Sequence, residues 1–396
     1  MGMGAQLMAL PFMIVWYGAW IISSITRPLI LATFFCMALN PRAAKAKIIL
    51  FVNTFRYLIL SKDKKWKKSD ENPASFFSKD DNGEYIVVDK KTVVFLRHGE
   101  STWNDTFNKG DRKQVKFLMA FIPNLFISLA YEWYFLVRGR SDESWFYDSP
   151  LSSKGISQAE GVAKFLRNTD PKYATPKEAK FLRLIKGEDD TSTADGSGNG
   201  RCVFVSSNLR RATSTCAIAM SGRLDRKIPG DNIIILQELQ EASINPDAQS
   251  ISPPFGKLVT SFTDSNHVKD IYADQTVTSL NKGNKDIKSN GKKRMHAFCD
   301  LIFATGNDDG GKKKKNDNTG SLLSDADNLL CTGHSYWFRA FFQTYLPSDF
   351  QHVSKTKKLI NGGMVGFTLC HTKAKTTGED KYMIDPNSLV VLYGGF

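Results

Sequence analysis

Short apolar runs alternate with amphipathic segments from about residue 89 to the C-terminus. Three of the runs have the length and apolar content of buried strands and lie at 91–96, 201–207 and 328–334. Segments with helical periodicity are found at 152–168, 208–220, 292–304 and 335–346. Two apolar runs near the C-terminus, at 358–372 and 388–396, are typical of strands that close a sheet. This alternation predicts an α/β domain over 89–396.

The hydrophobic pattern at the N-terminus is of a different kind. The stretch 7–25 has 19 residues without a charge, which is about what a helix needs to cross the roughly 30 Å hydrocarbon layer of a membrane. We therefore expect a membrane anchor within 1–40. A second apolar run, 29–39, is too short to span alone, so it either extends the first helix or returns as a re-entrant arm. A cleaved signal peptide is disfavoured because no basic segment precedes the apolar run.

A basic segment follows this anchor. Between Arg42 and Lys68 the chain has nine Lys or Arg residues and one acid, Asp63, which gives +8 of the total net charge of +13. Basic residues beside a membrane helix favour the cytosolic side, so we expect 41–88 to be a juxtamembrane linker and the folded domain to be cytosolic. Its apolar part, 48–60, is expected either to lie along the lipid surface or to pack on the folded domain.

Polar tracts at 187–200, 281–293 and 305–320 interrupt the α/β domain, and their Gly, Asp and Lys content is typical of flexible surface insertions. The last tract contains four consecutive lysines without interleaved aromatic residues, so we expect a solvated loop and no nucleic-acid site. The six cysteines show neither a CxxC pair nor metal-ligand spacing, which predicts reduced thiols that are buried or idle.

Two of the predicted strands lead directly into a histidine. His98 follows the first strand and His334 ends the third, while Arg211 lies shortly after the second. Ligand sites of open α/β sheets lie at the carboxyl ends of the strands, so neighbouring strands would bring these residues and Arg97 into one pocket. Guanidinium groups clamp phosphoryl oxygens, and a neutral imidazole can attack phosphorus. The pattern predicts a phosphoryl-transfer site, in which Gly99 would let the backbone approach the phosphate.

Four motifs in a fixed order carry a resemblance to a known family. They are RHGESTWN at 97–104, DSPLSSKGISQA at 148–159, SNLRRAT at 207–213 and TGH at 332–334. The chain resembles the histidine phosphatase superfamily, the phosphoglycerate-mutase-like group, from about residue 91 to the C-terminus. The resemblance implies a three-layer α/β/α sandwich with a mixed, mostly parallel sheet.

The resemblance also implies a role for each matching residue. His98 would be the phosphorylated nucleophile, and Arg97 and Arg211 would clamp the phosphate. His334 would contact the phosphoryl oxygens and stabilise the charge of the transition state. Asn104 would add a neutral hydrogen bond to the same group.

Two choices between nearby residues follow from the same motifs. Register with the family motif selects Arg211 over Arg210, which we expect at the surface because one step along a helix turns a side chain by about 100°. A proton donor for the leaving group has two candidates, Glu241 and Glu238, each of which follows a Leu-Gln pair. The segment LQEASINPD resembles the acid segment of phosphatase-like members, which favours Glu241.

Departures from the family pattern bear on the activity. The chain lacks the acid motif of the glycolytic mutases, so we expect a metal-independent phosphatase that hydrolyses a phosphomonoester without a bound cofactor. A phosphomutase and a catalytically silent scaffold that binds phosphorylated partners are the alternatives. The substrate class stays open between a small metabolite, a lipid head group and a phosphoprotein. Four other histidines are expected to be structural, namely His267, His296, His352 and His371.

An insertion at 105–147 contains a further apolar run, 115–137, that is long enough to span a membrane. A span here would place His98 and His334 on opposite sides of the membrane, which a shared pocket forbids. We therefore expect a hydrophobic flap that dips into the membrane or covers the pocket. Extra core packing is the alternative for this run.

Overall fold

The computed structural model describes residues 23–66, 71–81, 83, 85–110, 112–188, 202–304, 323–375 and 377–396. The spanning part of the expected anchor therefore lies outside the described residues, as do nearly all of the tract 187–200 and the whole of 305–320.

The described strands form one eight-stranded mixed sheet in the order β4-β3-β2-β5-β1-β6-β7, with β8 also paired to β6. The five strands from β4 to β1 run parallel, and β6 pairs antiparallel with β1, β7 and β8. Their bounds are β1 Asp89–Arg97, β2 Cys202–Ser207, β3 Ile233–Leu236, β4 Thr276–Val277, β5 Asn328–Gly333, β6 Met364–Lys373, β7 Asp380–Ile384 and β8 Val390–Tyr393. The expected mixed, mostly parallel sheet is confirmed.

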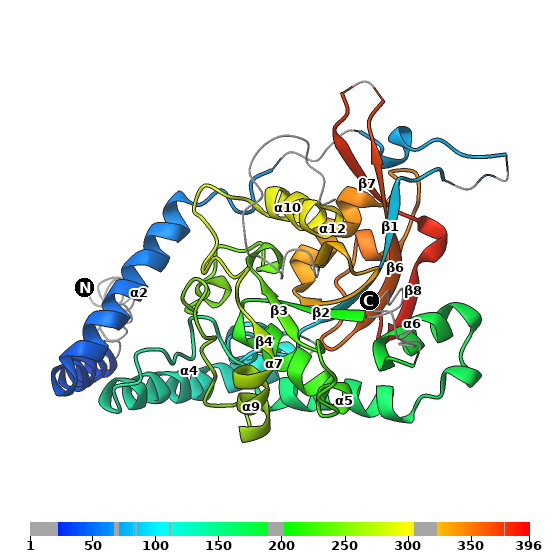
Figure 1. The fold of residues 1–396 in the computed structure, drawn as a ribbon. Coiled ribbons are helices and arrows are strands. Elements are labelled where there is room, and N and C mark those ends of the chain that lie inside the picture. The colour runs from blue at the N-terminus through cyan, green and yellow to red at the C-terminus, as the bar shows by residue number, and fades with distance from the viewer. Residues whose placement is uncertain are drawn as a thin grey trace, which may run out of the picture.

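Helices cover both faces of this sheet (Figure 1). On β1, Val93 and Phe95 pack in a core with residues of α10 and α12, whereas Val94 and Leu96 pack in a second core with residues of α5, α6, α7 and α9. Alternate side chains of a strand point to opposite faces, so a strand buried on both faces is apolar throughout. The three-layer arrangement follows. The helices are α5 Ser153–Asn168, α6 Pro176–Lys186, α7 Arg210–Ala219, α9 Asn266–Asp274, α10 Gly291–Phe303 and α12 Ser335–Tyr345.

Three further helices lie away from the sheet. The apolar helix Ser23–Leu39 is followed by α2 (Pro41–Leu60), and α4 (Gln114–Val137) packs beside them after the short α3 (Thr102–Phe107) (Figure 1). Trp133 Nε1 of α4 donates a hydrogen bond to Thr33 Oγ1 over 3.0 Å, and Lys47 Nζ of α2 lies 2.8 Å from Glu132 Oε2. These polar contacts hold α4 against the N-terminal helices.

The interpretation of 115–137 as extra core packing is wrong for most of its length. In α4, Ser128, Phe135 and Leu136 are buried, while residues such as Met119 are exposed, with 73% of the Met119 surface accessible. The helix is long and apolar enough to cross a membrane. Pro123 is accommodated inside it.

The tract 281–293 differs from the flexible surface insertion that its composition predicts. Asn281 and Lys285 are fully buried, and α10 begins at Gly291 within the tract. The Asn281 side chain accepts from Asn208 Nδ2 over 3.1 Å, so tertiary contacts recruit this polar segment into the domain. The six cysteines are free and buried, as predicted.

Candidate functional site

The pairing of three parallel strands creates the site. β5 lies between β2 and β1, and Arg97 of β1 pairs with Gly333 of β5. His98 and His334 therefore leave the sheet at the same edge, where their ring centroids are 4.9 Å apart. Arg211 arrives from α7, which begins three residues after the end of β2. The expectation that these strands are neighbours is confirmed.

Hydrogen bonds fix the tautomer of His98. Its Nδ1 lies 2.5 Å from the carbonyl oxygen of Gly99, which can only accept, so Nδ1 carries the proton. The other ring nitrogen, Nε2, then holds a lone pair, and Arg211 Nε donates to it over 3.4 Å. The ring is 3% exposed. This arrangement presents an unprotonated nitrogen to a group held by Arg211.

His334 has one nitrogen bound and one without a partner. Its Nε2 lies 2.8 Å from Ser207 Oγ, at the end of β2. Its Nδ1 is buried and has no hydrogen-bond partner among the described residues. Because unpaired buried polar atoms are costly, this nitrogen is suited to an oxygen atom of a bound ligand.

The two arginines of the pocket are held by main-chain oxygens. Arg97 Nη1 donates to the carbonyl of Leu359 over 2.6 Å. Arg211 Nη1 donates to the carbonyl of Asp247, and Arg211 Nη2 lies 3.4 Å from the Asp247 carboxylate. Arg211 is 2% exposed, so its charge is almost fully removed from water. The Asp247 carboxylate therefore offsets part of the charge of Arg211.

The role predicted for Gly99 has a different physical basis from the one that the sequence suggested. A Cβ atom on Gly99 would lie 2.3 Å from the carbonyl oxygen of Gly155, at the start of α5. The same helix supplies Gln158, whose Oε1 accepts from the Glu100 amide over 2.8 Å. Thr215 Oγ1 of α7 accepts from the Gly99 amide. The glycine therefore lets α5 pack closely on the loop that carries His98.

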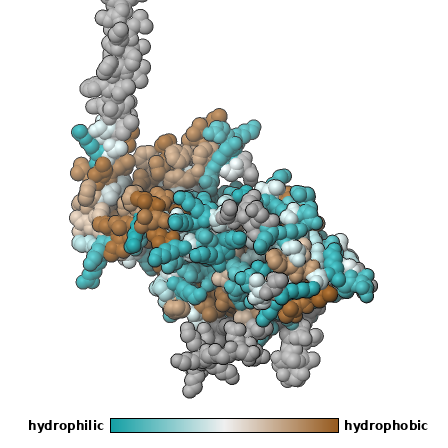
Figure 2. Space-filling model, turned by 90° about the horizontal axis from the view of Figure 1, so that it is seen from above, coloured by the Kyte–Doolittle hydropathy of each residue, from teal (hydrophilic) through white to brown (hydrophobic). Residues whose placement is uncertain are grey.

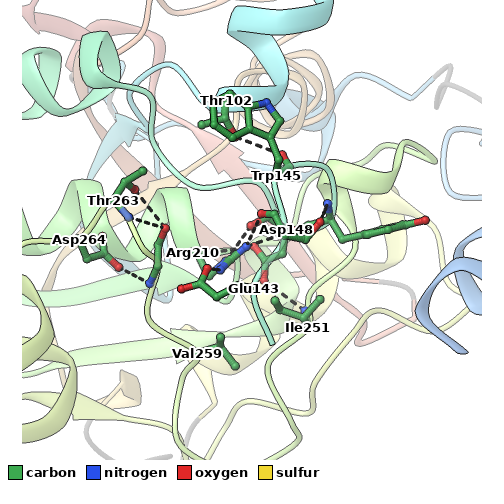
Figure 3. A network of polar contacts seen from close by, with 12 residues as sticks. Thr102, Glu143, Trp145, Asp148, Arg210, Ile251, Val259, Thr263 and Asp264 are labelled. Atoms are coloured by element: carbon green, nitrogen blue, oxygen red, sulfur yellow. Dashed lines mark hydrogen bonds and ion pairs between the residues drawn. The ribbon is translucent and has the colours of Figure 1, made fainter. Parts of the chain in front are cut away.

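Arg210 is a correction to the sequence analysis, because it is buried and not at the surface. It is 1% exposed, and its Nη1 lies 2.9 Å from Glu143 Oε2. Its main-chain amide donates to Asp148 Oδ1 and its Nε to the Asp148 carbonyl, both over 2.8 Å (Figure 3). Nine of the ten residues of α7 are buried, so both arginines find protein partners. Arg210 anchors the segment before α5 beside the pocket.

The two candidate acids differ in their surroundings. Glu241 Oε1 accepts from the amides of Ala242, over 3.0 Å, and Trp337, over 3.1 Å. Trp337 lies in the first turn of α12, three residues after His334, which places the Glu241 carboxylate beside the site. Glu238 is buried, and its Oε1 lies 3.1 Å from Lys282 Nζ. The choice of Glu241 stays a prediction that this placement supports.

Asn104 lies on α3, close behind the His98 loop. Its Oδ1 accepts from Asn108 Nδ2 over 2.6 Å, and its amide donates to Ser101 Oγ, which caps the helix. Its hydrogen bond to a phosphate stays a prediction. Of the remaining histidines, His267 and His371 lie 2.6 and 2.7 Å from carboxylates, as structural residues do.

Four residues of the site were not identified from the sequence. Asp247 is the last residue of the LQEASINPD segment, so its position carried a signal that could have been used. Asn361 Nδ2 donates to the His98 carbonyl over 3.0 Å. Ser207 contacts His334, and Lys285 contacts the carbonyl of Glu241. Ser207 is the first residue of the SNLRRAT motif, so a local signal marked its position as well. The contacts of Asn361 and Lys285 are tertiary, and no local pattern predicts them.

Burial and positive charge keep both imidazoles neutral. Burial lowers the pKa of His98 well below its usual value, and the charges of Arg211 and Arg97 lower it further. Burial likewise lowers the pKa of His334, with Arg211 as the next largest cause. Burial raises the pKa of Asp247, an effect that Arg211 opposes. A neutral His98 with an unprotonated Nε2 is the state that a nucleophile needs.

Neither a protein-family profile nor a curated protein matches the sequence. Among solved structures, mycobacterial hydrolase 1 is similar with 13% identity and a TM-score of 0.31, over 74% of this chain and 97% of that one. A mycobacterial glucosyl-3-phosphoglycerate phosphatase is similar with 13% identity and a TM-score of 0.30, over 74% and 97%. A phosphoserine phosphatase from Entamoeba histolytica has 17% identity and a TM-score of 0.26, over 70% and 89%. At this similarity, the chemistry of the chain must be inferred from its own residues.

The depressed pKa values predict how stability changes with pH. Unfolded histidines bind protons below about pH 6.5, whereas folded His98 and His334 do not, so acidification favours the unfolded state. Between pH 7 and 5, the free energy of unfolding of the wild-type chain should fall by up to about 1.4 kcal/mol per pH unit for each of the two histidines. The double variant His98→Asn/His334→Asn should not show this additional loss. Urea unfolding in detergent, followed by tryptophan fluorescence, measures how the free energy of unfolding of each chain changes with pH. Parallel pH dependences would contradict the neutral state of these rings.

Proposed function

We propose that the chain is a phosphatase that hydrolyses a phosphomonoester through a phosphohistidine on His98. The observation that carries the proposal is the unprotonated Nε2 of His98, which lies beside the Arg211 guanidinium, with both side chains buried. Arg97, Arg211 and the unpartnered Nδ1 of His334 would bind the phosphoryl oxygens. This pocket combines a nucleophile with an oxyanion site.

The reaction has two steps. His98 Nε2 forms a bond to phosphorus, the bond from phosphorus to the ester oxygen breaks, and that oxygen takes a proton from Glu241. Water then attacks the phosphohistidine while Glu241 takes back a proton. The bond between phosphorus and Nε2 breaks, and inorganic phosphate leaves. Each step uses groups of this chain, so the proposal includes neither a metal nor a bound cofactor.

Phosphoenzyme trapping tests the proposal. Full-length chain in detergent, mixed rapidly with a 32P-labelled aryl phosphate and quenched in base, should carry a base-stable, acid-labile adduct. His98→Ala should lose the adduct and reduce turnover by about 10⁴-fold or more, because the first bond cannot form. His267→Ala, at an exposed histidine, is the matched control and should keep both.

Other outcomes separate the alternatives. A folded chain that binds the aryl phosphate but forms no adduct would favour the phospho-binding scaffold. Transfer of the trapped phosphate to an added alcohol or phosphorylated acceptor in preference to water would favour a phosphomutase. An adduct that persists in His98→Ala would move the nucleophile to another residue.

We also propose that the chain is anchored in a membrane through residues 1–40. The described part of this segment, the helix Ser23–Leu39, is apolar and continues into α2, where residues such as Phe51 and Phe55 are exposed. Figure 2 shows hydrophobic residues gathered at one end of the molecule, while the rest of the visible surface is mostly hydrophilic. Large exposed apolar patches mark contacts with a membrane or a partner.

In this proposal α4 lies in the plane of the membrane surface and does not cross it. Phe121 near its start packs on Phe107 of α3, with ring centroids 6.1 Å apart. Near its other end, Glu132 accepts from Ser144 Oγ and from the Trp145 amide. Both ends of the helix are thus fixed to the same domain. The basic segment between Arg42 and Lys68 supports a cytosolic domain beside anionic lipids.

Site-directed labelling tests the lipid contact of α4. Because the six native cysteines are buried, a polarity-sensitive dye should react selectively with Met119→Cys in folded chain reconstituted into phosphatidylcholine and phosphatidylserine vesicles. We expect a blue-shifted spectrum and quenching by spin-labelled acyl chains. Val88→Cys, at an exposed position before β1, is the control and should report water. Equal spectra at both sites would contradict the proposal.

A further inference from the structure

Two cationic side chains flank an aromatic ring at the edge of the site. Lys64 Nζ lies 5.5 Å from the ring centroid of Tyr336, and Arg339 Cζ lies 5.2 Å from the same centroid. Tyr336 belongs to the first turn of α12, two residues after His334. Trp66 packs edge-on against it at 6.3 Å, so the segment after α2 forms part of the wall.

A third cation lies on the Arg97 side. Leu359, the residue after Lys358, supplies the carbonyl oxygen that accepts a hydrogen bond from Arg97 Nη1. Lys358 therefore adjoins the residue that holds Arg97, one of the two arginines proposed to bind the scissile phosphate. Burial lowers the pKa of Lys358, the charges of Arg97, Arg339 and Lys64 lower it further, and Glu241 opposes them. This electrostatic influence agrees with the position of Lys358 next to Leu359, which binds Arg97. We call Lys64, Arg339 and Lys358 the cationic rim.

The cationic rim has an excess of positive charge. In the described part of the chain, no carboxylate forms an ion pair with any of its three members. Arg97 and Arg211 lie deeper and are suited to the scissile phosphate. The rim therefore adds attraction for an anion beyond the one that the pocket already binds.

We propose that the cationic rim binds a second anionic group of the substrate, so that the preferred substrate carries another phosphate or a carboxylate beside the scissile phosphate. The proposal rests on the phosphatase function proposed above and narrows its substrate class. Exposed lysines and an arginine suit phosphate or carboxylate oxygens, whereas an apolar leaving group would gain nothing from them.

Matched synthetic esters test the rim. The probes are an alkyl monophosphate, the alkanediol bisphosphates of increasing length, and a phosphorylated ω-hydroxy acid of matching length. For the best bisphosphate, kcat/KM should exceed that of the monophosphate by about tenfold or more. This ratio is counted after division by about two, because a bisphosphate carries two equivalent phosphates that can each be hydrolysed. The excess should shrink with rising salt. The carboxylate probe shows whether a single additional charge suffices.

Charge removal at the rim supplies the decisive comparison. We expect most of the preference for the bisphosphate over the monophosphate to be lost in the triple variant Lys64→Gln/Arg339→Gln/Lys358→Gln. The rate of this variant on the monophosphate should stay within about twofold of the wild-type rate. Lys180→Gln, on α6, removes one charge from a helix without site residues and should keep the preference. Equal use of both probes by wild type would overturn the rim proposal alone. Absence of turnover on every probe would count against the phosphatase function itself.

A second, independent observation concerns a buried charge cluster. Asp63 lies three residues after α2 and is fully buried. Its Oδ2 accepts from Lys285 Nζ over 2.8 Å and its Oδ1 from Arg294 Nη1 over 2.6 Å. Its carbonyl accepts from the Gly291 amide. One acid thus balances two buried cations.

The same two cations hold the segment that carries Glu241. Lys285 Nζ donates to the carbonyls of Glu241 and Ser243 over 2.5 and 2.6 Å, so its three donors are all used. Arg294 Nη2 donates weakly to the carbonyls of Gln240 and Glu241, at 3.4 and 3.5 Å. The main chain on both sides of the proposed acid is therefore tied to this cluster.

We infer that Asp63 is a positioning residue for Glu241. Without its carboxylate, Lys285 and Arg294 would be two neighbouring buried charges without a counterion, which is strongly unfavourable. They would separate or admit water, and the carbonyls they hold would move with them. A displaced acid protonates the leaving group poorly, although the nucleophile and the phosphate clamps stay in place. This inference also rests on the proposed phosphatase function.

A leaving-group series distinguishes positioning from a general loss of structure. Phenyl phosphate needs protonation of its leaving oxygen, whereas 2,4-dinitrophenyl phosphate does not. In full-length chain in detergent, Asp63→Asn should lose about tenfold more kcat/KM on phenyl phosphate than on the dinitrophenyl ester. We compare kcat/KM because it reports the first step and excludes hydrolysis of the phosphohistidine, in which Glu241 also acts. Trapping of the phosphohistidine from the dinitrophenyl ester should stay intact, which shows that the basic chemistry has not failed.

A second buried ion pair provides the control. Asp231 lies two residues before β3 and binds Arg223 over 2.8 and 3.0 Å. Asp231→Asn should destabilise the chain and leave the ratio of the two substrates unchanged. An equal loss on both substrates in Asp63→Asn would overturn the inference. If that variant does not fold, Asp63→Glu gives the same comparison, because it keeps the charge and displaces the carboxylate.

Discussion

The burial of positive charge in the pocket is the constraint on which the rest of the site depends. Arg211 is almost fully removed from water, and such a charge is tolerated only where nearby groups compensate for it. Asp247 compensates in part, and both histidines respond by staying neutral. The incomplete compensation of the Arg211 charge and the neutral state of the two imidazoles therefore have the same cause.

The same electrostatic rule organises the surroundings of the pocket. Arg210 ties the segment before α5 to α7 through Glu143 and Asp148, and Asp63 ties the N-terminal segment to α10 and the Glu241 loop. Each cluster joins parts of the chain that are far apart in sequence. Buried ion pairs add little stability relative to apolar packing, but breaking one is costly, so they restrict the chain to one arrangement. The sheet places the histidines, and the charge clusters fix the loops around them.

The residues of the site that could be predicted are those whose position follows from local pattern. His98 and His334 follow buried strands, and strand ends converge by the geometry of a parallel sheet. The predicted exposure of Arg210 is wrong because a helical step of about 100° leads to exposure only where one face of the helix meets water. Nearly all residues of α7 are buried. Asp63 was counted as one acid in a basic segment, since nothing local shows that Lys285 and Arg294 fold back onto it.

Asp63 also bears on how the α/β domain is joined to the N-terminal helices. The sequence predicts that 41–88 is a linker, yet α2 ends at Leu60 and the fully buried Asp63 lies three residues later. Lys64 and Trp66 then contact Tyr336 of α12. So short a connection cannot act as a flexible tether. If α2 and α4 contact lipid as proposed, this short, buried connection would give Tyr336 and the cationic rim a fixed orientation to the membrane surface.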